Sequence, residues 1–202
     1  MNIGVLGGTF DPIHNGHLSV AEEVRVKLKL IRVIFMPAGQ PWMKEGLNPV
    51  LVAEHRVQMV RLAIVKVPYF QLSTLEIERP GPSYAVDAIT ELRSQIGTRY
   101  EIFSILGWDS LSQLPNWREP SRLITLCHLV VVPRPGYILP DIQSLAAKIP
   151  RLSERLIILD KPEIDISARE IRSRVAQGLP ISHLVPIPVE EYIKRHRLYV
   201  TE

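Results

Sequence analysis

The sequence is poor in cysteine, with Cys127 as the single one among 202 residues, so an internal disulfide is excluded. Cys127 stands beside an apolar run, which favours a buried thiol in a reducing compartment. The amino terminus lacks the basic stretch and the long apolar run of a signal peptide. No apolar run approaches the roughly 18 residues that a membrane span needs. These absences predict a cytoplasmic protein that does not contact a membrane.

Excess charge of one sign is also nearly absent, since 24 Lys and Arg stand against 21 Asp and Glu, a net charge of +3. The excess is not gathered into a run, so we expect no nucleic-acid partner. Apolar residues make up 46% of the chain and charged residues 22%, which is typical of a globular protein. We expect one domain over residues 1–202, helical from about residue 167, and leave a homo-oligomer open.

Short apolar runs alternate with helical patterns along the chain. The apolar runs predict strands at 3–6, 31–36, 69–75, 100–106, 128–132 and 155–159. Apolar spacings of three and four residues predict helices at 15–28, 53–65, 83–96, 140–148, 167–177 and 189–196. Nearly continuous apolar strands are typical of a parallel sheet. The alternation predicts an α/β fold, a doubly wound, Rossmann-like parallel sheet with helices on both faces, which binds ligands at the carboxyl ends of its strands.

The loop after the first expected strand has the most distinctive pattern, Gly7-Gly8-Thr9-Phe10-Asp11-Pro12-Ile13-His14-Asn15-Gly16-His17. It is neither the G-x-G-x-x-G motif nor the G-x-x-x-x-G-K-[ST] loop. Two glycines precede a helix start, and helix N-termini bind phosphate. His14 and His17 are three apart and therefore share one face of the first turn. Taken singly, the two glycines fit a turn, and the two histidines fit surface or core positions. A metal site built on the two histidines would lack a third ligand of matching spacing.

As a whole, this string resembles the G-G-T-F-D-P-x-H-x-G-H motif of the H-x-G-H nucleotidyltransferases, most of all bacterial nicotinate mononucleotide adenylyltransferases. The resemblance implies transfer of AMP from ATP to nicotinate mononucleotide, with release of pyrophosphate, in NAD synthesis. It implies that His14, His17 and Arg172 are catalytic, and that Gly8, Thr9 and Phe10 bind ATP. Mg²⁺ would arrive with ATP, and no metal site on the protein is expected.

Two later segments resemble the rest of the family's ATP site. Residues 166–172, Ile-Ser-Ala-Arg-Glu-Ile-Arg, are similar to I-S-S-T-x-I-R, with Arg169 in place of threonine. The similarity implies ATP contacts from Ile166, Ser167 and Arg169, although Ser167 with the glutamate three residues later is also a capping box. Residues 106–109, Leu-Gly-Trp-Asp, resemble G-x-D, so that Gly107 would approach the nucleotide and Asp109 would bind its ribose. A helix cap is the alternative for Asp109.

Four segments resemble the family's acceptor site. Residues 82–87, Pro-Ser-Tyr-Ala-Val-Asp, are similar to P-S-Y-T-x-D, with Ala85 in place of threonine. In the family, backbone N–H groups at the start of this helix bind the nicotinate carboxylate. Ser83 is a plausible N-cap of the helix. Trp117 corresponds to an indole that stacks on the pyridine ring, and Arg118 stands where an aromatic residue is common. Arg134 would face the acceptor. Lys44 would face a phosphate, with a solvent-exposed lysine as the alternative.

Other functions are weighed against this one. Phosphopantetheine adenylyltransferases share the first motif, but usually have threonine at the position of His14 and lack the tryptophan-bearing segment. A class I aminoacyl-tRNA synthetase is disfavoured, because the chain is short and has no K-M-S-K-S-like string. A nucleotide-binding sensor without catalysis is disfavoured by the intact histidines and Arg172, and stays open because Ala85, Arg118 and Arg169 depart from the family pattern. The resemblance ends near residue 172, and the last thirty residues carry no chemistry that the sequence identifies.

Overall fold

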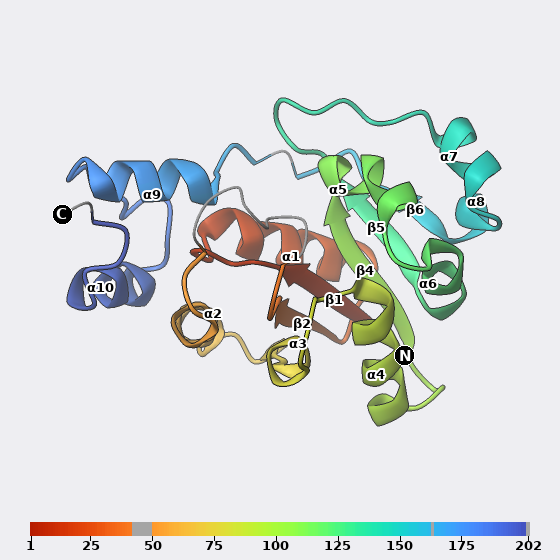
Figure 1. Cartoon of the computed structure of the whole chain (residues 1–202), viewed down its shortest axis with the longest axis horizontal. Coiled ribbons are helices and arrows are strands. Elements are labelled where there is room, and N and C mark those ends of the chain that lie inside the picture. The colour runs from red at the N-terminus through yellow and green to blue at the C-terminus, as the bar shows by residue number, and fades with distance from the viewer. Residues whose placement is uncertain (42–49, 163, 201–202) are drawn as a thin grey trace.

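A computed structural model of the chain describes residues 1–41, 50–162 and 164–200. They form a parallel sheet with the strand order β3-β2-β1-β4-β5-β6. The strands are β1 (Asn2–Gly8), β2 (Arg32–Pro37), β3 (Phe70–Leu72), β4 (Glu101–Gly107), β5 (His128–Val132) and β6 (Leu156–Ile158). The order reverses between β1 and β4, at the centre of the sheet (Figure 1). The expected Rossmann-like α/β fold is therefore confirmed.

Helices cover both faces of the sheet, as expected (Figure 1). The longer ones are α1 (Asn15–Lys27), α2 (Ala53–Ile64), α4 (Ala85–Ile96), α9 (Ala168–Ala176) and α10 (Ile187–Arg195). The shorter ones are α3 (Leu75–Glu78), α5 (Trp108–Ser112), the 3₁₀ turn Leu114–Asn116, α6 (Pro120–Leu126), α7 (Ile142–Lys148) and α8 (Leu152–Arg155). Among the described residues no helix is long and apolar enough to cross a membrane.

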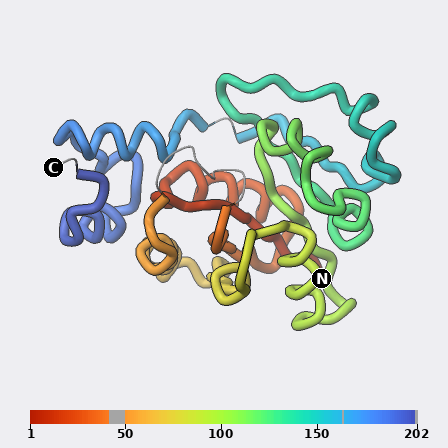
Figure 2. Tube along the Cα trace, in the orientation of Figure 1, coloured from red at the N-terminus to blue at the C-terminus, as the bar shows by residue number. Residues whose placement is uncertain are grey.

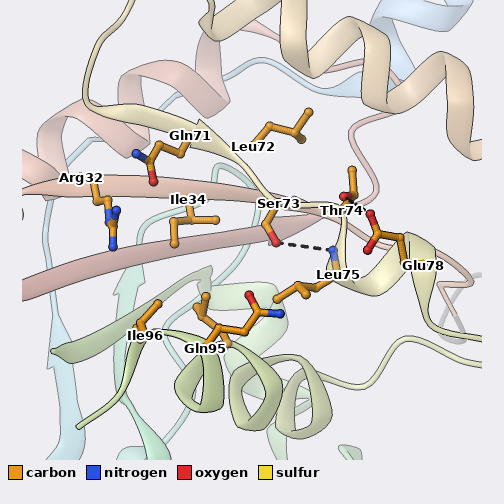
Figure 3. Close-up of a pocket in the computed structure, with 11 residues that line it drawn as sticks. Arg32, Ile34, Gln71, Leu72, Ser73, Thr74, Leu75, Glu78, Gln95 and Ile96 are labelled. Carbon is orange, nitrogen blue, oxygen red and sulfur yellow. Dashed lines mark hydrogen bonds between the residues drawn. The ribbon is translucent and has the colours of Figure 1, made fainter. Parts of the chain in front are cut away.

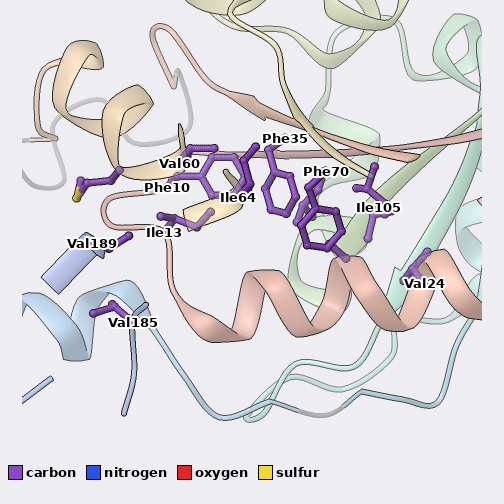
Figure 4. Packing of buried hydrophobic residues seen from close by; sticks show 14 of the residues in the cluster. Phe10, Ile13, Val24, Phe35, Val60, Ile64, Phe70, Ile105, Val185 and Val189 are labelled. Atoms are coloured by element: carbon purple, nitrogen blue, oxygen red, sulfur yellow. The ribbon is translucent and has the colours of Figure 1, made fainter. Parts of the chain in front are cut away.

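Side chains of the central strands alternate between two apolar cores, because successive residues of a strand point to opposite faces. In β2, Val33 and Phe35 belong to the core under α1 and α2, whereas Ile34 and Met36 belong to the core under α4 and α6. Figure 4 shows the first core, in which the Phe10 ring lies near Phe35. The two buried faces explain why the strands read as continuous apolar runs.

The C-terminal segment packs on the same core as α1 and α2. Ile171 of α9 and Val189 of α10 are fully buried there, together with residues of the connection between the two helices. In Figure 2 this segment, coloured blue, lies at the end of the molecule beside the start of α1. The helices expected at 167–177 and 189–196 are present as α9 and α10.

Three local expectations were wrong. The third strand ends at Leu72 rather than Leu75, because Leu75 starts α3. Ser83 does not cap α4: Tyr84 is the N-cap, and the Ser83 hydroxyl accepts hydrogen bonds from the N–H groups of Gly39 (2.9 Å) and Gln40 (3.2 Å). In α10 the four-residue spacing of Glu190 and Lys194 predicts an ion pair on an exposed face; the pair is present at 2.6 Å, but Glu190 is buried.

Candidate active site

The candidate site lies at the carboxyl edge of the sheet, where the strand order reverses between β1 and β4. The loop of residues 9–14 leaves β1 and enters α1, and Gly107 to Asp109 leave β4 beside it. Arg134 follows β5 and reaches back to Asp109. Connections diverge at such a reversal and leave a crevice there, which is where doubly wound sheets bind ligands.

The two histidines of the first loop form a stacked pair. His14 is the N-cap of α1 and His17 lies in its first turn. Their ring centroids are 3.6 Å apart, and the His14 backbone N–H donates a hydrogen bond to His17 Nδ1 at 3.2 Å. Because Nδ1 accepts, a neutral His17 carries its proton on Nε2, which is then a hydrogen-bond donor. The pair therefore places a donor at the N-terminus of α1.

His14 is neutral at physiological pH. Its side chain is buried, and burial together with the positive charge of Arg134 lowers its pKa to about 4. Its side chain faces the backbone N–H of His17 in a capping-box arrangement, but its buried Nδ1 makes no hydrogen bond of good geometry among the described residues. A Cβ on Gly16 would lie 3.0 Å from this Nδ1 and from Ile164. The glycine of H-x-G-H thus leaves room for the ring.

Arg56 holds the loop after β1 to the loop after β2. This arginine of α2 is 2% exposed. Its guanidinium donates to the carbonyls of Thr9 (2.9 Å), Ala38 (2.7 Å), Gly39 (3.2 Å) and Leu51 (2.9 Å). Four carbonyl oxygens satisfy donors that would otherwise be costly to bury. The buried Arg56 side chain therefore holds the backbone of both loops in place next to the candidate site.

Asp11 joins the first loop to the C-terminal segment. Its carboxylate accepts from the Tyr199 hydroxyl at 2.7 Å and from the Leu51 N–H at 3.4 Å. Its backbone carbonyl accepts from Arg172 of α9 at 2.7 Å. Burial and the charge of Asp11 raise the pKa of Tyr199, so its hydroxyl stays protonated and donates. The last residues of the chain, in which the sequence showed no chemistry, thus reach the loop that carries the histidines.

Asp109 and Arg134 form a close ion pair beside the histidines, with 2.6 Å between Oδ2 and the guanidinium. Asp109 lies inside α5 and does not cap it, since Gly107 is the N-cap. A Cβ on Gly107 would lie 2.5 Å from Asp109 Oδ1, so a larger residue here would displace the Asp109 carboxylate. That oxygen is buried and has no hydrogen-bond partner within the described part of the chain. It remains available to accept a hydrogen bond from a ligand.

The start of α9 brings a second helix N-terminus to the site through Arg172. Ser167 caps this helix by accepting from the Glu170 N–H at 3.1 Å, which confirms one half of the capping box. The Glu170 carboxylate pairs loosely with Arg174, at 3.9 Å. Ile166 is half-buried against the first core, and Arg169 is exposed on the first turn. Of the two arginines, only Arg172 is seen to contact the first loop.

Two of the expected acceptor residues, Ala85 and Arg118, lie at the start of α4. Ala85 is its first residue and Asp87 lies in its first turn. Arg118 lies 3.9 Å from the Asp87 carboxylate and stacks over Tyr84, and the adjacent Trp117 is half-buried. The expected residue Lys44 lies outside the described residues. Gly8 and Thr9 are half-buried at the end of β1, whereas the Phe10 ring is buried in the core, so only its backbone can face a ligand.

A depression of about 410 Å³ lies apart from these residues, between the β2–β3 edge of the sheet, α3 and the end of α4 (Figure 3). Arg32, Gln71, Leu75 and Gln95 are among its lining residues. The residues expected in the site from the sequence do not line it, so the candidate site remains the edge that carries the histidines.

Three residues that organise the site escaped the sequence reasoning, namely Asp11, Arg56 and Tyr199. Arg56 had a signal, because it falls on the apolar face of its helix with Met59 and Val60. An arginine in such a stripe must find buried acceptors. Tyr199 had none, because its partner is 188 residues away.

Comparison with known proteins decides the family. The cytidylyltransferase-like family model matches residues 5–174. The chain belongs to this family. A Dehalococcoides mccartyi protein named "Probable nicotinate-nucleotide adenylyltransferase" is 47% identical over 98% of this chain and 97% of its own length. A Roseiflexus protein of the same name is 49% identical over the same shares. The resemblance seen in the first loop is thus confirmed, and it extends over 98% of the chain instead of ending near residue 172.

Solved structures show the same fold. The nicotinic acid mononucleotide adenylyltransferase of Plasmodium falciparum complexed with NaAD superposes on this cytidylyltransferase-like chain with a TM-score of 0.78. The match covers 98% of this chain and 97% of the other at 18% identity. The same enzyme complexed with APC gives a TM-score of 0.77.

Removal of the Tyr199 hydroxyl is expected to loosen the first loop. In Tyr199→Phe the Asp11 carboxylate loses a buried donor, which costs roughly 1.5–3 kcal/mol. Hydrogen exchange followed by mass spectrometry should show residues 9–14 exchanging at least about tenfold faster. The matched control is Tyr192→Phe, which removes a hydroxyl from α10 that bonds to His55 at 2.9 Å. Equal exchange at residues 9–14 in both variants would contradict this role.

The low pKa of His14 makes the folded protein less stable at acid pH. Between pH 6.5 and 4 the unfolded chain binds a proton at this residue and the folded chain does not, so stability falls as the pH drops through this window. The shift to about 4 corresponds to at most about 3 kcal/mol. Urea unfolding at pH 7.5, 5.5 and 4.5 should show His14→Asn losing less stability on acidification than the wild type. Parallel losses would show that His14 does not cause the acid sensitivity.

Proposed function

We propose that this chain transfers AMP from ATP to nicotinate mononucleotide, giving nicotinic acid adenine dinucleotide and pyrophosphate, in NAD biosynthesis. One observation carries the proposal: a stacked histidine pair, of which His14 is neutral, stands at a helix N-terminus where the sheet order reverses, beside an unpaired carboxylate oxygen. That arrangement suits a nucleoside phosphate. The names of relatives at 47% and 49% identity support the choice of reaction.

The transfer proceeds by direct displacement in this proposal. The 5′-phosphate of the acceptor attacks the α-phosphorus of ATP in line, the bond to the bridging oxygen breaks, and pyrophosphate leaves with that electron pair. A phosphate monoester is already an anion near neutral pH, so no general base is needed. The protein contributes positioning and charge stabilisation. His17 donates from Nε2 to the α-phosphate, and His14 supports it while holding the phosphates.

ATP lies between the first loop and the start of α9. The backbone of Gly8, Thr9 and Phe10 lines its approach, and Arg172 stabilises the charge of the leaving pyrophosphate. Arg172 already anchors the loop through one N–H, and its guanidinium has further donors for phosphate. Ile166, Ser167 and Arg169 complete this side, where the exposed Arg169 replaces the hydroxyl of the family motif. Gly107 admits the nucleoside, and Asp109 Oδ1 accepts from its ribose.

The donor set fits a magnesium ion that is carried by the nucleotide. In residues 1–41, 50–162 and 164–200, no three His, Cys, Asp or Glu side chains converge into a metal site. Phosphate oxygens and water would therefore hold the ion. Bound there, Mg²⁺ would neutralise part of the phosphate charge.

Nicotinate mononucleotide occupies the α4 side of the site. Ala85 offers a backbone N–H from the first turn, which α4 itself does not use. The indole of Trp117 provides a flat apolar surface for the pyridine ring. Arg118 and Arg134 add positive charge, as would Lys44. We infer that residues 1–202 form a single nucleotidyltransferase domain, supported by the core that the C-terminal segment shares with α1 and α2.

Pyrophosphate release tests the reaction and its acceptor together. With ATP and Mg²⁺, we expect strong turnover with nicotinate mononucleotide and little with phosphopantetheine. Turnover with phosphopantetheine alone would keep the mechanism and refute the acceptor. ATP binding without pyrophosphate release from either acceptor would refute catalysis and favour a nucleotide sensor.

Two histidine variants, one in the site and one outside it as a control, are measured in the same assay. His17→Ala removes a donor to the transition state, so turnover should fall by about 10²–10³ while the fold, followed by circular dichroism, persists. His196→Ala removes an exposed imidazole from the end of α10 and should leave turnover unchanged. Wild-type turnover in His17→Ala would exclude the residue from the mechanism.

A further inference from the structure

Arg118 is held in place by ion pairs, while its guanidinium donates no hydrogen bond to the described residues. Its guanidinium lies 3.9 Å from Asp87, 3.7 Å from Glu119, and 4.9 Å from the centre of the Tyr84 ring. These distances exceed those of hydrogen bonds. Within the described part of the chain it donates no hydrogen bond, whereas Arg122 donates to the same Glu119 at 3.0 Å. Arg118 is thus oriented and still able to bind an anion.

The charges around Arg118 leave it with an excess of positive charge. Asp87 is shared with Arg79, which also lies 3.9 Å away, and Glu119 is shared with Arg122. Three arginines therefore face two carboxylates, a local balance of +1. Burial raises the pKa of the nearby Glu76, which disfavours a further negative charge. An incoming anion meets attraction here rather than repulsion.

The position of Arg118 connects it to the site. Asp87 lies in the first turn of α4, whose start is tied through Ser83 to Gly39 and Gln40 after β2. The preceding residue, Trp117, has a buried indole N–H with no partner among the described residues. Trp117 packs against the same apolar cluster as Tyr84 and Ala85, and the Arg118 guanidinium that follows it in the chain lies beside the first turn of α4. These are the groups that bind a flat ring bearing a carboxylate.

We propose that Arg118 is the specificity-determining residue that selects an acceptor with a carboxylate on its pyridine ring over one with a carboxamide. This inference rests on the proposed function. A carboxylate accepts two parallel N–H bonds from a guanidinium. A carboxamide offers one acceptor oxygen, and its NH₂ group, a donor, would face the N–H donors of the guanidinium. Arg118 therefore discriminates the acid from the amide by both charge and hydrogen-bond pattern.

The test compares nicotinate mononucleotide with nicotinamide mononucleotide in wild type, Arg118→Gln and Arg118→Lys. Arg118→Gln should lower kcat/KM for the acid about fivefold, the upper value for an ion pair at a solvent-exposed site. It should leave the amide and the KM for ATP nearly unchanged. Arg118→Lys keeps the positive charge but lacks the planar guanidinium, so its kcat/KM for the acid should lie between those of the wild type and Arg118→Gln. The matched control is Arg122→Gln, an arginine of similar exposure, 50% against 53%.

An unchanged ratio of acid to amide in Arg118→Gln, or an equal loss in Arg122→Gln, would overturn the inference. Calorimetric titration of both mononucleotides separates this result from failure of the proposed function. If the wild type binds the acid more tightly and Arg118→Gln loses that preference, the inference stands even where turnover is absent. If the wild type binds both equally, the inference fails.

Discussion

The hydrogen bonds to Asp11 are the constraint on which the candidate site depends. Through its carboxylate and its carbonyl, this residue joins the loop after β1 to Tyr199 at the end of the chain and to Arg172 of α9. Arg56 fixes the same loop from beneath, through Thr9. Because these partners come from three distant parts of the sequence, the loop reaches its position only when the whole fold has formed.

A loop fixed in this way can act without rearrangement. Displacement at phosphorus needs donors in place before the charge shifts, since reorganisation would add to the barrier. Stacking on His14 and the hydrogen bond to Nδ1 hold the His17 ring in one orientation. The low pKa of His14 keeps the His14 ring neutral, so His14 does not form ion pairs with nearby carboxylates. Binding energy is thereby available for positioning the two substrates.

The sequence predicted the fold from local patterns and the site from one motif. Helix α1 and strand β5 follow directly from apolar spacing, and the doubly wound order follows from alternation. The expectation for Ser83 failed because its hydroxyl serves the loop after β2, a tertiary contact that no local pattern contains. The short helices α3 and α6 are too brief for periodicity to reveal. Arg56 could have been found on its apolar stripe, but Tyr199 could not.

Isotope exchange between labelled pyrophosphate and ATP tests the central claim most directly, because it reports the bond that breaks. Direct transfer of AMP predicts that label enters ATP when nicotinate mononucleotide is present and does not enter when the protein is given ATP and Mg²⁺ alone. Label that enters ATP without an acceptor would reveal an adenylyl-protein intermediate and contradict direct transfer. The absence of exchange in both cases, with ATP bound, would contradict adenylyl transfer altogether.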